Sequence, residues 1–350
     1  MPDHLSKQTS CSLKRFNTFG VDYLCDDLQL IEKKIELDEL RKKTDMPLLI
    51  LGGGSNVLFT ENFKGTVAVI NSKGIKVTQD NNFYYLTVAA GEDWHSLVKF
   101  SLVNNMPGLE NLALIPGTVG AAPIQNIGAY GTEFCDVCHW VTYSDLITSK
   151  SVTLSADKCL FGYRESIFKA QLKDSAVITS VGIKLAKNWR PNLSYGPLHH
   201  FDPQKVSATD IFNLVCQLRE QKLPNPKVLG NAGSFFKNPI VEASVFMTLA
   251  QKYPNIVGYA LADGRMKLAA AWLIEQAGLK GFILGKAGVH QEQALVLVNL
   301  SGASGTDIAK LAIHIIDVVN NQFSVVLEPE PRIIGKYGEV TLNDVIAKGV

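Results

Sequence analysis

The segment of residues 114–131 has the composition of a ligand-binding loop. It reads Leu-Ile-Pro-Gly-Thr-Val-Gly-Ala-Ala-Pro-Ile-Gln-Asn-Ile-Gly-Ala-Tyr-Gly and contains no charged residue. Glycines let a backbone turn at positive φ and approach a ligand closely, while prolines restrict its freedom. Such a backbone can direct several N–H groups at one anion. Gln125 and Asn126 add side-chain amides that can bind the polar edge of a ring.

The alternative for residues 114–131 is an ordinary surface loop. Long loops without structure of their own are usually functional or disordered, and this one is too apolar to be disordered. We therefore interpret the segment, called the cradle below, as a cofactor-binding loop.

A second glycine-rich stretch, Gly52-Gly-Gly-Ser-Asn56, directly follows the apolar residues 48–51, which predict a short buried strand. A glycine triplet after a strand suits a phosphate, although a tight turn explains it equally well. The stretch lacks the lysine of a P-loop and the glycine spacing of the dinucleotide-binding fingerprint, so both of those architectures are disfavoured.

Composition and charge describe a globular protein. The 350 residues are 46% apolar and 19% charged, and the length predicts two or three domains. A net charge of +1 gives no overall field toward nucleic acid or an anionic membrane, so we expect neither partner. The N-terminus lacks a signal-like apolar region, and no apolar run approaches the roughly 18 residues of a membrane span. Six cysteines without a signal for export are interpreted as reduced thiols, which predicts a cytoplasmic protein.

Two patterns suggest metal or haem binding, but we expect neither of them to bind a metal or haem. Cys135-Asp-Val-Cys138-His139 matches the c-type haem attachment pattern, but haem attachment normally needs export and the flanking residues resemble a strand. His199 and His200 are adjacent, so their side chains point apart. The sequence therefore predicts no metal site.

The apolar pattern predicts the elements that must position these segments. A polar helical stretch is expected up to about residue 43. Strands are predicted at 66–70, 75–78, 83–89, 137–143, 151–154, 176–185 and 294–300, and helices at 92–104, 207–221, 266–276 and 304–321. Residues 188–203, with Trp189 and Tyr195, form either a linker or a lid. The two prolines in 222–226 mark a domain boundary.

Two further residues allow two interpretations each. Arg164 is either a surface cation or a clamp for an anion. Ser234 belongs either to a glycine turn entering a strand or to a desolvated pocket, where its hydroxyl can act. No G-x-S-x-G elbow surrounds Ser234, so a hydrolase nucleophile is not supported.

Five motifs in one order resemble those of a known family. They are Gly52–Asn56, the cradle, Gly162-Tyr-Arg164, Gly230–Pro239 and Leu327–Gly335. Together they resemble the bacterial UDP-N-acetylenolpyruvoylglucosamine reductases, also called UDP-N-acetylmuramate dehydrogenases. The resemblance extends from about Phe16 to Gly335, and the segment with Tyr195 resembles the subtype that has an extra substrate-covering loop. Pro331 departs from the β-branched residue usual beside the acidic residue at position 330.

The resemblance implies an α+β, three-domain flavoprotein of the vanillyl-alcohol-oxidase-like (PCMH-type) FAD-binding fold. Residues 1–70 with 323–350, and residues 71–223, would hold FAD without a covalent bond, and residues 224–322 would bind substrate. The implied reaction reduces the UDP-sugar enolpyruvyl ether UDP-N-acetyl-3-O-(1-carboxyvinyl)glucosamine to UDP-N-acetylmuramate for peptidoglycan synthesis. Hydride would pass from NADPH to FAD and then to substrate in a monomeric enzyme.

The resemblance also implies roles for single residues. Ser234 would donate a proton, while Arg164 and Glu330 would act at the substrate carboxylate, where a cation stabilises developing negative charge. Substrate contacts are implied for Tyr163, Tyr195, Lys222, Asn238 and Gln293. Cofactor contacts are implied for Gly52, Gly53, Gly54, Ser55, Asn56, Gly117, Thr118, Gly120, Gln125, Asn126, Gly128, Ala129 and Tyr130.

Two other functions remain open on the sequence. One is a flavin oxidase of the same fold that acts on a sugar or lactone; many of these tether flavin through a histidine, and residues 51–60 and 114–131 contain none. The other is a nucleotide-binding protein without catalytic activity.

Overall fold

A computed structural model describes residues 10–43 and 46–347. The chain forms two compact units. The terminal unit consists of Met1–Asp26, Gly54–Gly65 and Lys222–Val350, and the central unit consists of Asp27–Gly53 and Thr66–Gln221. The predicted division into three domains stays a prediction.

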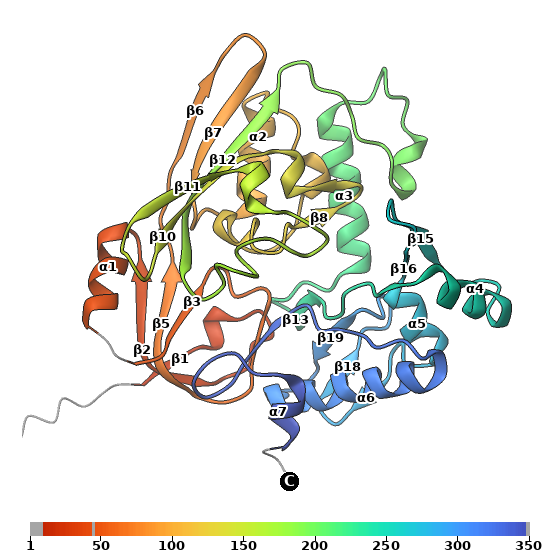
Figure 1. Cartoon of the computed structure of the whole chain (residues 1–350). Coiled ribbons are helices and arrows are strands. Elements are labelled where there is room, and N and C mark those ends of the chain that lie inside the picture. Colours follow the sequence, from red (N-terminus) through yellow and green to blue (C-terminus); the bar gives the residue numbers. More distant parts are fainter. Residues whose placement is uncertain (1–9, 44–45, 348–350) are drawn as a thin grey trace, which may run out of the picture. The chain divides into compact units, whose positions relative to one another are not determined.

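The central unit is built on a five-stranded antiparallel sheet in the order β11-β10-β12-β7-β6 (Figure 1). β12 pairs with both β10 and β7, and its Val181 lies opposite Val141 on one side and Val88 on the other. All three valines are fully buried. They belong to one apolar core with Leu97 and Val98 of α2. The strands predicted at 83–89, 137–143 and 176–185 are therefore confirmed, and they pack into one core.

The bounds of the central-unit elements agree with most of the predicted ones. The strands are β3 (Leu48–Leu51), β6 (Ile75–Gln79), β7 (Phe83–Ala89), β8 (Gly128–Ala129), β9 (Thr132–Glu133), β10 (Cys138–Asp145), β11 (Ser151–Ser155) and β12 (Ala176–Ala186). The helices are α1 (Lys34–Lys43), α2 (Trp94–Val103) and α3 (Ala208–Lys222, which ends in the terminal unit). Short 3-10 helices are η2 (Glu110–Leu112), η3 (Val119–Ala121), η4 (Phe134–Asp136), η5 (Ala156–Cys159) and η6 (Gly196–His200).

The terminal unit contains a second antiparallel sheet, in the order β13-β19-β18-β17, and the long helix α6 packs on β18 and β19 (Figure 1). α6 begins with a capping box in which Ser304 Oγ accepts from Asp307 N and the Asp307 carboxylate accepts from Ser304 N. Its buried stripe includes Leu311, Ile315 and Val319, at helical spacing. This confirms the predicted helix at 304–321.

The remaining terminal-unit elements are short. The strands are β1 (Cys11–Ser12), β4 (Val57–Phe59), β13 (Gly230–Ser234), β14 (Ile240–Val241), β15 (Gly258–Ala260), β16 (Met266–Leu268), β17 (Ile283–Leu284), β18 (Ala287–Val289), β19 (Val296–Asn299) and β20 (Arg332–Ile334). The helices are η1 (Lys14–Phe16), α4 (Ala243–Lys252), α5 (Ala270–Gln276), α6 (Gly305–Phe323) and α7 (Leu342–Ala347). β2 (Leu24–Ile31) and β5 (Phe63–Ile70) each begin in the terminal unit and end in the central one.

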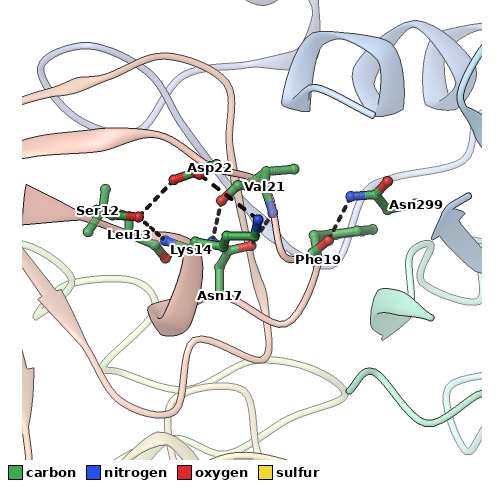
Figure 2. Close-up of polar contacts among 8 residues, drawn as sticks. All are labelled: Ser12, Leu13, Lys14, Asn17, Phe19, Val21, Asp22 and Asn299. Carbon is green, nitrogen blue, oxygen red and sulfur yellow. Dashed lines mark hydrogen bonds and ion pairs between the residues drawn. The ribbon is translucent and has the colours of Figure 1, made fainter. Parts of the chain in front are cut away.

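The turn at residues 16–20 is held by the side chain of Asn17 (Figure 2). Asn17 Nδ2 donates to Leu13 O at 2.8 Å and to Val21 O at 3.0 Å, and Asn17 Oδ1 accepts from Val21 N at 3.1 Å. Asn299 Nδ2 donates to Phe19 O at 3.0 Å, so this turn is also joined to β19. The turn-like opening expected from Phe16-Asn-Thr-Phe-Gly20 is confirmed, and one buried amide explains it.

Two predicted elements were wrong. The polar stretch before Lys43 was predicted to be helical, but β2 occupies Leu24–Ile31 and α1 begins only at Lys34. β2 gains its hydrogen bonds from neighbouring strands, and such pairing overrides local propensity. The predicted helix 266–276 is β16 followed by α5, because Met266–Leu268 pairs as the middle strand between β14 and β15.

None of the helices in the described ranges combines the length and apolar character that crossing a membrane requires.

Candidate functional site

The two glycine-rich loops meet inside the central unit. A Cβ atom on Gly53 would lie 3.1 Å from Gly117 Cα, and one on Gly52 would lie 2.5 Å from Thr118 Oγ1. Real Cβ atoms essentially never approach other heavy atoms as closely as the second distance. Gly53 therefore packs on the backbone of Gly117, and Gly52 packs on the side chain of Thr118, so that a larger residue at either position would force the two loops apart.

The cradle is also fixed to the strand-to-helix connection between β7 and α2. Trp94 N donates to Gly117 O at 3.0 Å, Val119 N to Glu92 O at 2.8 Å and Gly120 N to Ala90 O at 2.8 Å. A Cβ on Gly120 would lie 2.6 Å from the Cβ of Ala90. The first part of the cradle is therefore held by backbone hydrogen bonds against the end of β7 and the start of α2.

His95 holds the first residue of the cradle. Its Nδ1 accepts from Leu114 N at 3.0 Å, and its ring stacks on Phe212 of α3 at 5.6 Å between centroids. Leu114 has a φ of 56°, which is uncommon for a residue other than glycine. Burial, followed by the nearby Lys99, lowers the pKa of His95, which favours the neutral ring that accepts this hydrogen bond.

Asn126 joins the cradle to the loop that contains Arg164. Its Nδ2 donates to Glu133 Oε2 at 2.7 Å and to Gly162 O at 3.1 Å, and its Oδ1 accepts from Cys135 N at 2.9 Å. Asn126 is 1% exposed. The sequence suggested an amide that binds a ring edge, whereas these contacts give its side chain a role in positioning the backbone.

Arg164 lies beside the cradle. It sits in a turn closed by reciprocal hydrogen bonds between Gly162 and Glu165, and its φ is 56°. Its Nη1 lies 3.7 Å from the position that a Cβ on Gly128 would take. Non-glycine residues with such backbone cost about 1–3 kcal/mol and cluster at functional sites. These contacts favour the anion-clamp interpretation of Arg164 over the surface cation.

Arg219 of α3 is a candidate residue that the sequence reasoning missed. Its Nε is buried and makes no hydrogen bond with the described residues. Burial lowers the pKa of its guanidinium, and the charged or titratable groups that face it are Tyr130, Cys216 and Arg164. A buried cation beside another cation is costly unless an anion is present. The sequence did contain one indication of this position: Arg219 follows Ile211 and Val215 at i+4 spacing, which places it on the buried face of α3.

In the terminal unit, the structure brings the Ser234 strand beside Glu330. Glu330 N donates to Phe235 O at 2.7 Å, and Asn56 Nδ2 donates to Glu330 O at 3.3 Å. Ser234 itself is half-buried and pairs with Val296 of β19. Three predicted motifs, around residues 56, 234 and 330, are therefore neighbours. Pro331 is buried and does not prevent this arrangement.

The other predicted substrate contacts in this unit are less clustered. Asn238 Oδ1 accepts from Ala270 N at 2.9 Å, at the start of α5, and Gln293 Oε1 accepts from Leu295 N at 3.3 Å. Lys222 is exposed at the end of α3.

Gly54, a predicted cofactor contact, has a φ of 64° and packs on Phe16, where a Cβ would lie 2.0 Å from the carbonyl oxygen.

The remaining predicted contacts lie near the cradle. The Arg164 guanidinium lies 5.6 Å from the centre of the Tyr163 ring. The Tyr130 and Tyr195 rings make an edge contact with centroids 5.7 Å apart. Ala129 pairs with Thr132 in the hairpin of β8 and β9. Gln125 and Ser55 are half-buried, and both interact with other groups of the chain.

No group of three or more His, Cys, Asp or Glu residues suited to a metal ion occurs in residues 10–43 and 46–347. All six cysteines are free thiols. Burial, followed by the nearby Asp136, raises the pKa of Cys135 to about 11, so this thiol is protonated and a poor metal ligand.

Comparisons with known proteins agree with this arrangement. Residues 224–334 match the C-terminal domain of UDP-N-acetylenolpyruvoylglucosamine reductase, and residues 35–156 match an FAD-binding domain. The UDP-N-acetylenolpyruvoylglucosamine reductase of Shewanella oneidensis is 59% identical over 335 residues, which cover 95% of this chain and 98% of the relative. The chain belongs to this reductase family. The Salmonella typhi reductase is 50% identical over 339 residues, covering 96% and 99% of the two chains.

A solved reductase supports the fold. The crystal structure of UDP-N-acetylenolpyruvylglucosamine reductase from Thermus caldophilus matches with a TM-score of 0.64 at 23% identity, and covers 93% of this chain and 97% of its own. The chain therefore has the expected α+β, PCMH-type FAD-binding fold. Its family membership and its FAD-binding domain show that it is an FAD-dependent oxidoreductase of peptidoglycan synthesis.

The residues present fit FAD. The packing of Gly52 and Gly53 on Thr118 and Gly117 brings two glycine-rich backbones together, and such backbones can direct N–H groups at a diphosphate. The buried guanidinium of Arg219, whose Nε makes no hydrogen bond with described residues, suits an anionic group of a bound cofactor or substrate. We expect residues 52–53, the cradle and Arg219 to hold FAD.

Gly120→Ala should weaken FAD binding. The added Cβ would lie 2.6 Å from Ala90 Cβ, so the cradle must shift from the sheet edge. Such overpacking costs about 1–3 kcal/mol. We expect a lower ratio of flavin to protein absorbance and a lower melting temperature. Gly338→Ala is the control, because a Cβ there meets no atom within 4 Å. Equal flavin content in both variants would contradict the inferred contact.

His95→Gln should make the protein more resistant to acid. The folded state lowers the pKa of His95, so its stabilisation is present above the unfolded value of 6.5 and is lost as the pH falls through the folded pKa. Glutamine keeps an acceptor oxygen and does not titrate. We expect a smaller loss of unfolding free energy below pH 6.5 in denaturant titrations. His200→Gln, at an exposed site, should behave as the parent protein.

Proposed function

We propose that this enzyme reduces UDP-N-acetyl-3-O-(1-carboxyvinyl)glucosamine to UDP-N-acetylmuramate with NADPH as the hydride donor. The observation that most supports this is that Glu330 lies beside the residue after Ser234, since Glu330 N donates a 2.7 Å hydrogen bond to Phe235 O. An alcohol and a carboxyl group fixed in this way suit a reaction that adds a proton to one carbon next to a carboxylate.

Bound FAD would supply the hydride chemistry, accepting hydride from NADPH and delivering it to the enolpyruvyl carbon. The cradle and residues 52–56 would orient it without a covalent bond, since neither segment contains a histidine. The relatives from Shewanella oneidensis and Salmonella typhi are reductases, which favours this reaction over the oxidation of a sugar or lactone.

Arg164 would stabilise the negative charge that spreads into the substrate carboxylate when hydride adds. The backbone of Arg164 is fixed, because reciprocal hydrogen bonds between Gly162 and Glu165 close its turn and Lys169 Nζ donates to the Arg164 carbonyl oxygen at 2.9 Å. Arg219 would add a second positive charge beside it. Glu330 would assist at the same carboxylate by protonation or hydrogen bonding.

Ser234 would deliver the proton to the carbon next to the carboxylate. It is the last residue of β13, just after Gly233, whose φ of 71° turns the strand. Gly233 N donates to Asn231 Oδ1 at 2.9 Å, so the backbone before Ser234 is held by a residue that is 4% exposed. A positioned serine with a high intrinsic pKa depends on such orientation.

Tyr163, Tyr195, Lys222, Asn238 and Gln293 would contact the UDP-sugar. We also propose that the enzyme acts in the cytoplasm as a monomer, without nucleic acid or membrane partners, and that its chain folds as the three domains expected from the sequence.

Ser234→Ala should separate the two half-reactions. Under anaerobic conditions the variant should bind FAD and be reduced by NADPH at nearly the parent rate, because that step needs no proton for an enol carbon. Oxidation of the reduced protein by the enolpyruvyl substrate should slow by about 10²–10⁴-fold. Stopped-flow absorbance of the flavin measures both steps. Ser234→Cys retains a proton and should recover part of the loss.

Ser244→Ala, on the exposed side of α4, is the matched control and should leave both steps unchanged. If Ser234→Ala slows both half-reactions equally, Ser234 is a structural turn residue. If the parent protein is reduced by NADPH but is not reoxidised by the enolpyruvyl substrate, the proposed reaction is wrong.

A further inference from the structure

Two buried polar residues of η2, Glu110 and Asn111, connect the cradle to the segment that leads to Tyr195. Both lie in the core of the central unit, with 2% and 3% of their surfaces exposed. Acidic residues are rarely buried this fully without a specific reason. Neither residue belongs to a motif identified in the sequence, and neither has a part in the reaction described above.

Glu110 is bound by the segment after β12. Its Oε1 accepts from Trp189 Nε1 at 2.7 Å, and its Oε2 accepts from Gly108 N at 2.6 Å. Burial raises the pKa of the Glu110 carboxyl, and the Gly108 and Trp189 donors offset part of that effect. The hydrogen bond to Trp189 therefore fixes the start of the segment 189–195, called the Tyr195 segment below.

Asn111 and Asn192 form the second connection. Asn111 Nδ2 donates to Tyr130 O at 2.8 Å, in the cradle, and to Asn192 O at 3.0 Å, in the Tyr195 segment. Asn192 Nδ2 in turn donates to Gly131 O at 2.8 Å and to Thr132 Oγ1 at 3.1 Å. The end of the cradle and the Tyr195 segment are therefore joined in both directions by side-chain amides.

The contact between the two segments is close. Gly131 has a φ of 80°, and a Cβ on it would lie 2.6 Å from Ser194 Oγ and 3.5 Å from Tyr195 Cβ. The Tyr195 side chain itself is 48% exposed, and its ring makes an edge contact with Tyr130. Gly196 follows with a φ of 51° and open space around it. The base of the segment is thus fixed and its tip is open.

We propose that Glu110, Asn111 and Asn192 are positioning residues for the reaction, which hold Tyr195 in register with the cofactor-binding cradle. The hydrogen bonds tie the backbone on both sides of the Tyr130–Tyr195 ring pair, so the orientation of Tyr195 follows that of the cradle. This inference rests on the proposed role of Tyr195 as a substrate contact. Binding of FAD to the cradle then also orders the residue that meets the UDP-sugar.

Trp189→Phe and Asn192→Ala test the proposal in the flavin-loaded enzyme. Trp189→Phe keeps an aromatic side chain but removes the indole N–H that donates to Glu110 Oε1. Each variant should raise the KM for the enolpyruvyl substrate by about 3- to 10-fold, the equivalent of one or two hydrogen bonds. The rate of flavin reduction by NADPH and the flavin content should stay near the parent values. Trp140→Phe, on β10 over Gly182, is the matched control and should leave KM unchanged.

A double-mutant cycle with Tyr195→Ala separates this inference from the proposed function. If the positioning residues act through Tyr195, then Trp189→Phe and Asn192→Ala should raise KM little or not at all once Tyr195 is alanine. Additive effects on KM, or equal losses in flavin content and in both half-reactions, would overturn the inference and indicate a general role in stability. An unchanged KM in Tyr195→Ala alone would instead overturn the proposed substrate contact.

Discussion

The central unit depends on a backbone contact that leaves no room for side chains. Residues 52–53 pack on 117–118, and Gly120 packs on Ala90, so that two loops and one strand end meet at glycines. Hydrogen bonds from Trp94, Val119 and Gly120 fix the same region to the sheet. Rigid backbone N–H groups bind an anion without first having to be ordered, so this contact is where we expect a protein of net charge +1 to hold the diphosphate of its cofactor.

Buried polar groups are the second constraint. Asn126, Glu110 and Asn111 are each almost fully buried. Asn126 and Asn111 bind backbone carbonyl groups of neighbouring segments, and Glu110 binds the indole N–H of Trp189. A buried polar group that loses its partner costs about 1–3 kcal/mol, so each of these residues strongly favours one loop arrangement over others. Irregular segments are thereby given the definition that strands and helices obtain from their own backbone hydrogen bonds. The same reasoning makes Arg219, whose buried Nε makes no hydrogen bond with described residues, a marker for a ligand.

In the terminal unit, hydrogen bonds bring the candidate residues Asn56, Ser234 and Glu330 close together. Glu330 N binds Phe235 O and Asn56 binds Glu330 O, so residues far apart in the chain become neighbours. The contact of Asn299 with Phe19 likewise joins β19 to the first turn (Figure 2). Ser234 ends β13, and Glu330 directly follows an isolated bridge between Pro329 and Phe236, so both candidate residues are held by backbone pairing, which favours accurate positioning.

The residue types and their order were sufficient to identify the reductase family, FAD and most strands and helices, because glycine spacing and apolar periodicity are local properties of a chain. They also predicted Arg164, Ser234 and Glu330 as candidates. Only the tertiary structure decided that residues 24–31 form a strand, that Asn126 binds Gly162, and that Arg219 Nε and Glu110 are buried. The physical reason is that these outcomes depend on partners distant in sequence, and hydrogen bonding and burial with such partners override local preference.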